Sequence, residues 1–310
     1  KGNTTMDIQE SATGLRFPEG PIACVDGSII LVEIEAGRLT RIEASGKKQI
    51  IAETGGGPNG AAFGPDGRIY VCNNGGMRFV EKDDMLFPAP MNDDASNTGW
   101  IDAIDLKSGK VETIYRDCDD APLMAPNDIV FDSNGGFWFT DHGKMRRSTI
   151  DRGAVYYAAA DGSAIRRVIA PLDSPNGIGL SPDETELYVA ETHPGRVWAF
   201  QIDEPGTIIR IDGPAPWTPG RLLANPEGYC LLDSLAVDAK GNVCVGSIPN
   251  AIQVISQDGS AARRIEMPDL FPTNICFGLS APCHAYITLS AYGRLVSMPW
   301  PDGGNRLAFE

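Results

Sequence analysis

Six oxygen-bearing residues stand at one position of a repeated sequence phrase, and they are the side chains best placed to do chemistry. They are Glu19, Asn59, Asn127, Asn176, Asp233 and Asn274, and we call this set the polar ring. Carboxylate and amide oxygens are the donors that hard divalent cations prefer. If several such oxygens face one partly buried point, they cannot satisfy one another, because carboxylate oxygens only accept hydrogen bonds. Burying an unpaired carboxylate is costly in free energy. A bound cation resolves that conflict.

The donor types narrow the choice of cation. An all-oxygen set suits Ca²⁺ first, with Mg²⁺, Mn²⁺, Fe²⁺ and Zn²⁺ as alternatives, and dedicated zinc sites more often contain His or Cys. None of the three histidines, His142, His193 and His284, holds a ring position. Any single ring residue also fits a tight turn, because Asn and Asp before Gly are common turn residues. Six members in the same register favour a site over six unrelated turns.

The phrase that carries the polar ring predicts the architecture. It consists of a Pro or small residue, the ring residue, several apolar residues, a turn such as PDG, and a second apolar strand. The copies begin at Pro18, Pro58, Pro126, Pro175, Leu232 and Thr273, so they are 40, 68, 49, 57 and 41 residues apart. A four-stranded propeller blade takes about 40 to 50 residues. We therefore predict an all-β, six-bladed β-propeller in a single domain over residues 1–310.

This architecture places the polar ring. A β-sandwich also contains many short strands, but it gives no reason for six similarly phased copies. If the copies are equivalent blades, the ring residues lie at one height where the six inner strands begin, with side chains directed toward the central axis. We predict that the polar ring holds a metal ion.

The long second interval contains a segment, residues 77–100, that we call the insert. Connections of this length on a compact domain are usually functional or disordered. We expect the insert to form a lid or rim near the ring, with Phe79, Met85, Leu86 and Phe87 either roofing the site or only anchoring the segment. The PAPW run, residues 214–217, is a further candidate rim segment.

Composition excludes several classes of partner. The formal net charge is -15, which argues against nucleic acid, because that binding depends on clustered Lys and Arg. No apolar run approaches the about 18 residues of a membrane span. The seven cysteines are scattered without a CxxC pair, as expected for a reducing, cytoplasmic compartment. We expect a small-molecule ligand and a monomer or small homo-oligomer.

Four stretches of the chain resemble the gluconolactonase and regucalcin (senescence marker protein) family. They are FPEGP at Phe17, PNDIVFDSNGGFWFTD at Pro126, SPNGIGLSPDETELYVAET at Ser174 and LDSLAVDAKGN at Leu232, and the resemblance extends over nearly the whole chain. Members are six-bladed propeller lactonases. The resemblance therefore implies a metal-dependent hydrolase that opens a sugar lactone or another γ- or δ-lactone.

Residue by residue, the resemblance assigns roles to ring positions. The metal-binding glutamate, asparagine and aspartate of the family correspond to Glu19, Asn176 and Asp233. Asp233 doubles as general base, and Asn127 contacts substrate or a water. Six residues are expected at the substrate: Asn127, Asn59, Asp141, His142, Met145 and Asn274.

Departures from the family pattern leave the substrate open. Regucalcin-like members carry an arginine two places before the residue that matches Asn127, and Ala125 stands there in this chain. His142 replaces the proline that is usual in bacterial gluconolactonases. Two alternatives to a lactonase remain. One is a phosphotriesterase or arylesterase of the related calcium propellers, and the other is a non-catalytic propeller that binds calcium or a ligand.

Overall fold

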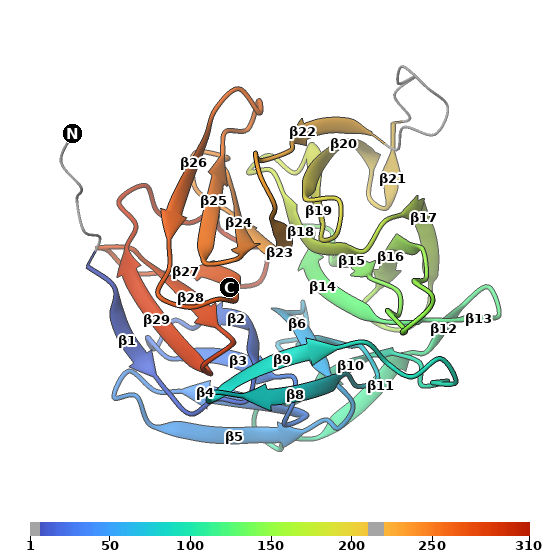
Figure 1. The fold of residues 1–310 in the computed structure, drawn as a ribbon. Helices are drawn as coiled ribbons and strands as arrows, with labels where there is room; N and C mark the ends of the chain where they lie inside the picture. Colours follow the sequence, from blue (N-terminus) through green and yellow to red (C-terminus); the bar gives the residue numbers. More distant parts are fainter. Residues whose placement is uncertain (1–6, 210–219) are drawn as a thin grey trace.

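The computed structural model describes residues 7–209 and 220–310, so the PAPW run lies outside the described residues. Within these ranges the chain forms strands and no helix. Six sheets are arranged radially around one axis (Figure 1). The prediction of an all-β, six-bladed propeller is confirmed.

The first three blades follow the chain from the inside outward, apart from the insert in blade two. Blade one consists of β2 (Pro18–Ala23), β3 (Ile29–Glu33), β4 (Arg38–Ile42) and β5 (Lys48–Glu53). Blade two consists of β6 (Pro58–Phe63), β7 (Ile69–Asn73), β10 (Trp100–Ile104) and β11 (Val111–Tyr115). Blade three consists of β14 (Pro126–Phe131), β15 (Gly136–Asp141), β16 (Gly153–Ala159) and β17 (Ile165–Leu172). Two hairpins lie outside the blades, β8 (Arg78–Lys82) with β9 (Met85–Ala89), and β12 (Asp117–Cys118) with β13 (Ala121–Pro122).

The last three blades continue the circle, and the N-terminal strand closes it. Blade four consists of β18 (Pro175–Leu180), β19 (Glu186–Glu191) and β20 (Arg196–Glu204), with β21 (Thr207–Ile208) and β22 (Arg221–Ala224) both paired to β20. Blade five consists of β23 (Leu231–Val237), β24 (Val243–Ile248), β25 (Ala251–Ile255) and β26 (Ala262–Glu266). Blade six consists of β27 (Pro272–Phe277), β28 (His284–Leu289), β29 (Arg294–Pro299) and β1 (Gln9–Ala12). Because β1 pairs with β29, the two ends of the chain are joined in one sheet.

Each inner strand carries a pairing irregularity at its ring residue. The register to the second strand shifts between Glu19 and Ile22 in β2, and at the equivalent place in β6, β14, β18, β23 and β27. A bulge bends its strand locally and re-aims a side chain. The six bulges therefore account for ring side chains that turn toward the axis while the rest of each strand packs between blades.

Glycines that follow ring residues let neighbouring inner strands approach closely. A Cβ atom on Gly20, whose φ is +54°, would lie 2.5 Å from the carbonyl oxygen of Asn59 in the next blade. A Cβ on Gly177 would lie 2.5 Å from the main-chain nitrogen of Leu235. A side chain at either place would push the blades apart, so these glycines fix the narrow diameter of the polar ring.

The hydrophobic core is divided among the interfaces between blades. One cluster joins blades two and three around Tyr70, Phe137 and Phe139, and another joins blades five and six around Ile252 and Trp300. All seven cysteines are free thiols. No helix in the described ranges is long and apolar enough to cross a membrane.

Candidate active site

A cavity of about 280 Å³, which we call the upper cavity, opens where the inner strands begin. Five members of the polar ring line it: Glu19, Asn59, Asn127, Asn176 and Asp233. They come from the inner strands of blades one to five, so five scattered sequence positions meet at one place. Asn274, the sixth member, does not line this cavity.

Glu19 is the most enclosed carboxylate of the polar ring, with 2% of its surface exposed. Its Oε2 accepts hydrogen bonds from the main-chain N–H of Gly20, at 2.8 Å, and from Nδ2 of Asn274, at 2.9 Å. Burial raises the pKa of Glu19 to about 7 even though these hydrogen bonds oppose the shift. The carboxylate is therefore positioned by donors but not neutralised by a cationic side chain.

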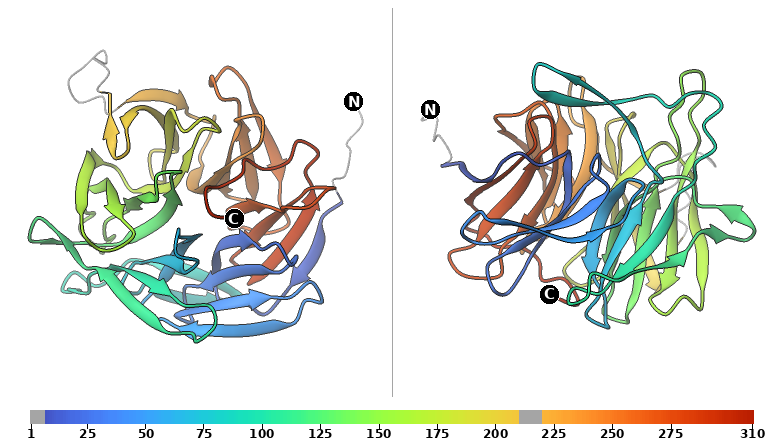
Figure 2. Two further views of the ribbon diagram at one scale, coloured as in Figure 1. Left: turned by 180° about the vertical axis from the view of Figure 1, so that it is seen from behind. Right: turned by 90° about the horizontal axis from the view of Figure 1, so that it is seen from below.

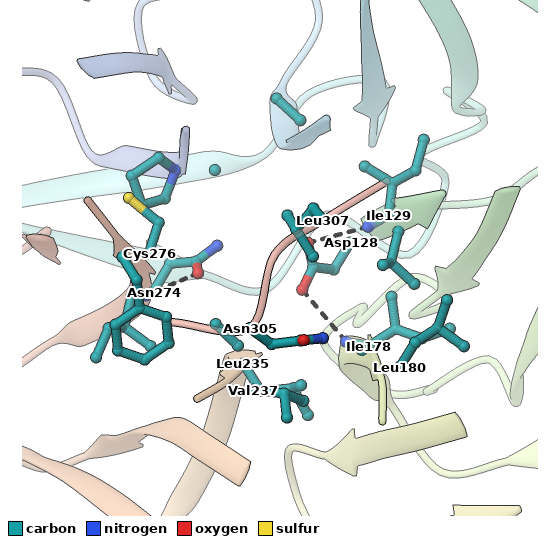
Figure 3. A pocket seen from close by; sticks show the side chains of 18 of the residues that line it. Asp128, Ile129, Ile178, Leu180, Leu235, Val237, Asn274, Cys276, Asn305 and Leu307 are labelled. Carbon is teal, nitrogen blue, oxygen red and sulfur yellow. Dashed lines mark hydrogen bonds between the residues drawn. The ribbon is translucent and has the colours of Figure 1, made fainter. Parts of the chain in front are cut away.

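Asn274 supports Glu19 from below. It lines a second, smaller hollow of about 70 Å³, the lower pocket, which the C-terminal segment crosses with Asn305 and Leu307 (Figure 3). Its Oδ1 accepts the main-chain N–H of Ile275 at 2.7 Å, and its Nδ2 is the donor to Glu19. The structure thus places Asn274 behind a ring carboxylate and away from the cavity in which we expected it to contact substrate.

The lower pocket also contains a carboxylate that the sequence analysis missed. Oδ1 and Oδ2 of Asp128 accept the main-chain N–H groups of Ile129, at 3.0 Å, and Ile178, at 3.2 Å (Figure 3). Burial, and then the charge of Glu19, raise the pKa of Asp128 to about 7. Asp128 directly follows ring residue Asn127, so the pair of polar residues was visible in the sequence. The sequence did not show that Asn127 would line the upper cavity and Asp128 the lower pocket.

Asp233 and Asn176 lie side by side on the cavity floor. Asn176 receives a hydrogen bond on Oδ1 from the Ser234 hydroxyl at 3.3 Å, and its Nδ2 donates to the Thr192 hydroxyl at 3.1 Å. These contacts turn the amide oxygen toward blade five. Burial, and then repulsion from Glu19, raise the pKa of Asp233 well above its ordinary value. Glu19 and Asp233 therefore interact unfavourably when both are ionised.

Asn127 supplies the clearest sign that the floor needs another partner. Only 7% of its surface is exposed, and its Oδ1 is a buried acceptor without a hydrogen-bond partner. A buried unpaired acceptor costs roughly 1–3 kcal/mol. In the described residues no three His, Cys, Asp or Glu side chains cluster as a metal site by themselves. The donor set that fits a cation is thus two carboxylates together with amide oxygens, which suits a hard divalent ion.

The loop after β15 forms one wall of the upper cavity. His142 and Met145, two of the residues expected at the substrate, line the cavity together with His193 of blade four. Burial lowers the pKa of His142 to about 4, so its imidazole is neutral at pH 7. Its Nδ1 lies 3.2 Å from the carbonyl oxygen of Gly143, which can only accept. The proton is therefore on Nδ1, and Nε2 carries a lone pair.

Asp141 has a different position from the one expected. It does not line the cavity, and its carboxylate accepts the main-chain N–H groups of Met124 and Ala125, each at 2.7 Å, and of Gly143, at 3.0 Å. It therefore fixes the shape of the loop that presents His142 and Met145. The sequence could not separate this supporting role from direct contact with substrate.

The insert crosses the mouth of the upper cavity as a strap. Its hairpin, β8 and β9, lies at the end of the propeller opposite the C-terminus (Figure 2). Phe79 packs on Phe17 with ring centroids 4.9 Å apart, and Phe87 packs on Phe271 at 5.6 Å. At the far side, the N–H of Met91 donates to the carbonyl of Met145 at 3.0 Å.

The residues of the strap that face the cavity are not the four we named. They are Met77, Arg78, Pro88, Ala89 and Met91, whereas Phe79, Met85, Leu86 and Phe87 do not line it. Leu86 is buried in a cluster with Phe17 and Ile34, so the anchoring alternative describes this residue. The tertiary contacts of the strap decide which of its side chains face the cavity, and these contacts were not visible in the sequence.

The match to known proteins follows this geometry. Residues 17–291 match the model of the SMP-30/Gluconolactonase/LRE-like region. The chain belongs to this family. The matched range begins two residues before Glu19 and includes every member of the polar ring, so the resemblance inferred from the motifs is confirmed.

Relatives of the SMP-30/Gluconolactonase/LRE-like family agree in sequence and in fold. Lactonase drp35 of Staphylococcus haemolyticus is 28% identical over 265 residues, which cover 84% of this chain and 72% of the relative. A gluconolactonase of Xanthomonas campestris superposes with a TM-score of 0.73 at 23% identity, over 94% of this chain and 89% of that one. A calcium-binding protein, regucalcin, of Agrobacterium tumefaciens superposes with a TM-score of 0.73 at 18% identity, over 97% and 96%. The two structural matches show the fold.

Proposed function

We propose that this protein is a lactonase that hydrolyses a cyclic ester at one divalent metal ion held by Glu19, Asn176 and Asp233. The observation that carries the proposal is the convergence of two carboxylates and several amides, one with an unpaired buried oxygen, on the floor of a single cavity. Family membership and the lactonase drp35 relative support a lactone as the substrate. A metal requirement accounts for two carboxylates that share the cavity floor and form no ion pair with a cationic side chain of the described residues.

The proposed reaction adds water to the lactone carbonyl. When bound, the ion supplies Lewis-acid polarisation of that carbonyl and positive charge near the developing oxyanion. Asp233 accepts a proton from the attacking water while the water oxygen bonds to the carbonyl carbon. The ring carbon–oxygen bond then breaks, the leaving oxygen takes the proton, and a hydroxy acid results. Asn127 donates an amide hydrogen bond to the substrate or to the water.

Replacing Asn274 by Ala is expected to weaken metal binding, although Asn274 does not line the cavity. The substitution removes the Nδ2 donor that orients Glu19. Loss of a group that orients a ligand typically costs about 10- to 100-fold in metal affinity or activity. Calcium titration by calorimetry measures this. The matched control is Asn305→Ala, which alters the lower pocket without touching Glu19; equal affinities in the two variants would contradict the role of Asn274.

Metal affinity is expected to fall as the solution is acidified. The pKa of Glu19 is raised to about 7, so below that pH the cation must displace a proton from the carboxyl group. Each displaced proton costs up to about tenfold in apparent affinity per pH unit. Affinity should therefore rise with pH through this range, and Asp233, whose pKa is also raised, adds to the slope. The Glu19→Gln variant should show a shallower dependence, and an unchanged slope in that variant would sink the assignment to Glu19.

Two alternatives to the lactonase proposal can be tested with one set of assays. A phosphotriesterase or arylesterase would use a similar set of oxygen donors, and a non-catalytic propeller would bind the ion alone. An assay of aldonolactones, simple γ- and δ-lactones and paraoxon-like esters separates them. Turnover confined to phosphoesters, or metal binding without turnover of any ester, would overturn the lactonase proposal.

A further inference from the structure

Lys144 is a charged group of the upper cavity that the proposed reaction does not use. Among the described residues it is the one lysine or arginine that is buried, with 5% of its surface exposed. It lines the upper cavity and donates a hydrogen bond from Nζ to the main-chain carbonyl of Asn74. None of the ion pairs formed by the described residues includes it.

This environment is unusual for an ammonium group. A buried lysine is normally paired with a carboxylate, because removing its charge from water is costly. The ammonium has three donors, and the hydrogen bond to Asn74 uses one of them. Burial lowers the pKa of Lys144 to about 8, and the charges of Asp141 and Asp151, neither of which forms an ion pair with it, oppose that shift. The side chain is therefore mostly protonated at pH 7 and lacks a counter-charge in contact with it.

The remaining wall supplies no anion to complete the contact. Much of it is apolar, formed by Phe17, Ile34, Met77, Met91, Met145 and Phe271. The two carboxylates of the cavity, Glu19 and Asp233, belong to the floor, where the proposed divalent ion balances their charge. With that ion bound, Lys144 is the buried cation of a largely apolar wall, and Arg78, the other cation of the lining, is exposed to solvent. The complement of Lys144 is an anionic group brought by the ligand.

We propose that Lys144 binds a carboxylate substituent of the substrate, so that the preferred lactone has a mainly apolar body and one acidic group outside the ester. This inference rests on the proposed function, because it concerns the substrate of the same cavity. It assigns specificity to a residue that takes no part in water activation.

A matched pair of substrates tests this role. They are γ-carboxy-γ-butyrolactone and the corresponding neutral carboxamide, which differ in charge but little in shape. The wild-type kcat/KM should favour the carboxylate by at least about tenfold, and Lys144→Gln should reduce that ratio by roughly 10- to 100-fold, mainly through KM of the carboxylate. Lys144→Gln retains a donor toward Asn74. Lys144→Arg should keep most of the preference because the charge remains.

The control is Arg147→Gln, which removes an exposed cation from the same loop, outside the lining of the cavity, and should change the ratio by less than about threefold. A merely structural role for Lys144 would lower kcat/KM for both substrates equally, and this result would overturn the proposal. So would a wild-type ratio near one.

If the wild type opens neither lactone with any divalent ion, the proposed function fails instead. Calorimetry with the open-chain hydroxy-dicarboxylate then decides about Lys144, with binding at least about tenfold weaker in Lys144→Gln supporting it and equal binding contradicting it.

Discussion

Replacing Asp233 by Asn is expected to lower kcat for lactone opening by about 10²- to 10⁴-fold, the usual contribution of a positioned general base. The amide keeps an oxygen that can face a cation but cannot accept the proton of the attacking water. Metal affinity should therefore fall much less than turnover. Steady-state kinetics on a γ-lactone, together with calcium titration of the same sample, separates the two effects.

The control for this variant is Asp102→Asn. Asp102 is a buried aspartate whose pKa is raised like that of Asp233, but it lies in β10 and accepts hydrogen bonds from Trp100, at 2.6 Å, and Thr113, at 2.8 Å. Its loss should affect stability and leave kcat largely unchanged. Wild-type turnover in Asp233→Asn would remove Asp233 from the role of base.

Replacing Glu19 by Gln is expected to weaken metal binding by at least about 100-fold. Groups that only orient a metal ligand contribute about 10- to 100-fold, and Glu19 is proposed to be a ligand itself and to supply one of the two negative charges on the floor. Turnover at limiting metal should fall in parallel and recover in part at high metal concentration. Calorimetry and a metal-activation curve measure both.

A surface substitution controls for the change in net charge. Glu53→Gln alters an exposed residue of β5 by the same charge and should leave the metal affinity within about threefold of wild type. If Glu19→Gln bound calcium as tightly as Glu53→Gln does, Glu19 would not be a metal ligand.

The architecture was predictable because the repeated phrase encodes one unit of it. Four inner strands begin at the predicted Pro18, Pro58, Pro126 and Pro175, and the other two begin one residue earlier than predicted, at Leu231 and Pro272. The outer strand of blade six was not predictable from the phrase, because β1 comes from the opposite end of the chain. Its pairing is a property of ring closure rather than of local sequence.

The residues of the site were predictable in outline, but the cavity or partner that each side chain faces was not. Sequence register placed six ring residues as equivalents, and five of them share the upper cavity. The hydrogen bonds around each candidate then decide its position. Asn274 donates to Glu19, and Asp141, which is outside the polar ring, accepts three main-chain N–H groups. Lys144 carried no signal in the sequence, because a lysine in a loop is ordinarily exposed. Its burial depends on Asn74, which is distant along the chain.

Removal and return of metal tests the central claim most directly. The purified protein is stripped with a chelator, resupplied separately with Ca²⁺, Mg²⁺, Mn²⁺, Zn²⁺ or Fe²⁺, and assayed on a panel of lactones. The proposal predicts that hydrolysis disappears on stripping and returns with one equivalent of at least one of these ions, while Glu19→Gln needs far more. Full lactone hydrolysis by the stripped protein would contradict it, and so would an ion that binds with one-to-one stoichiometry and restores no turnover.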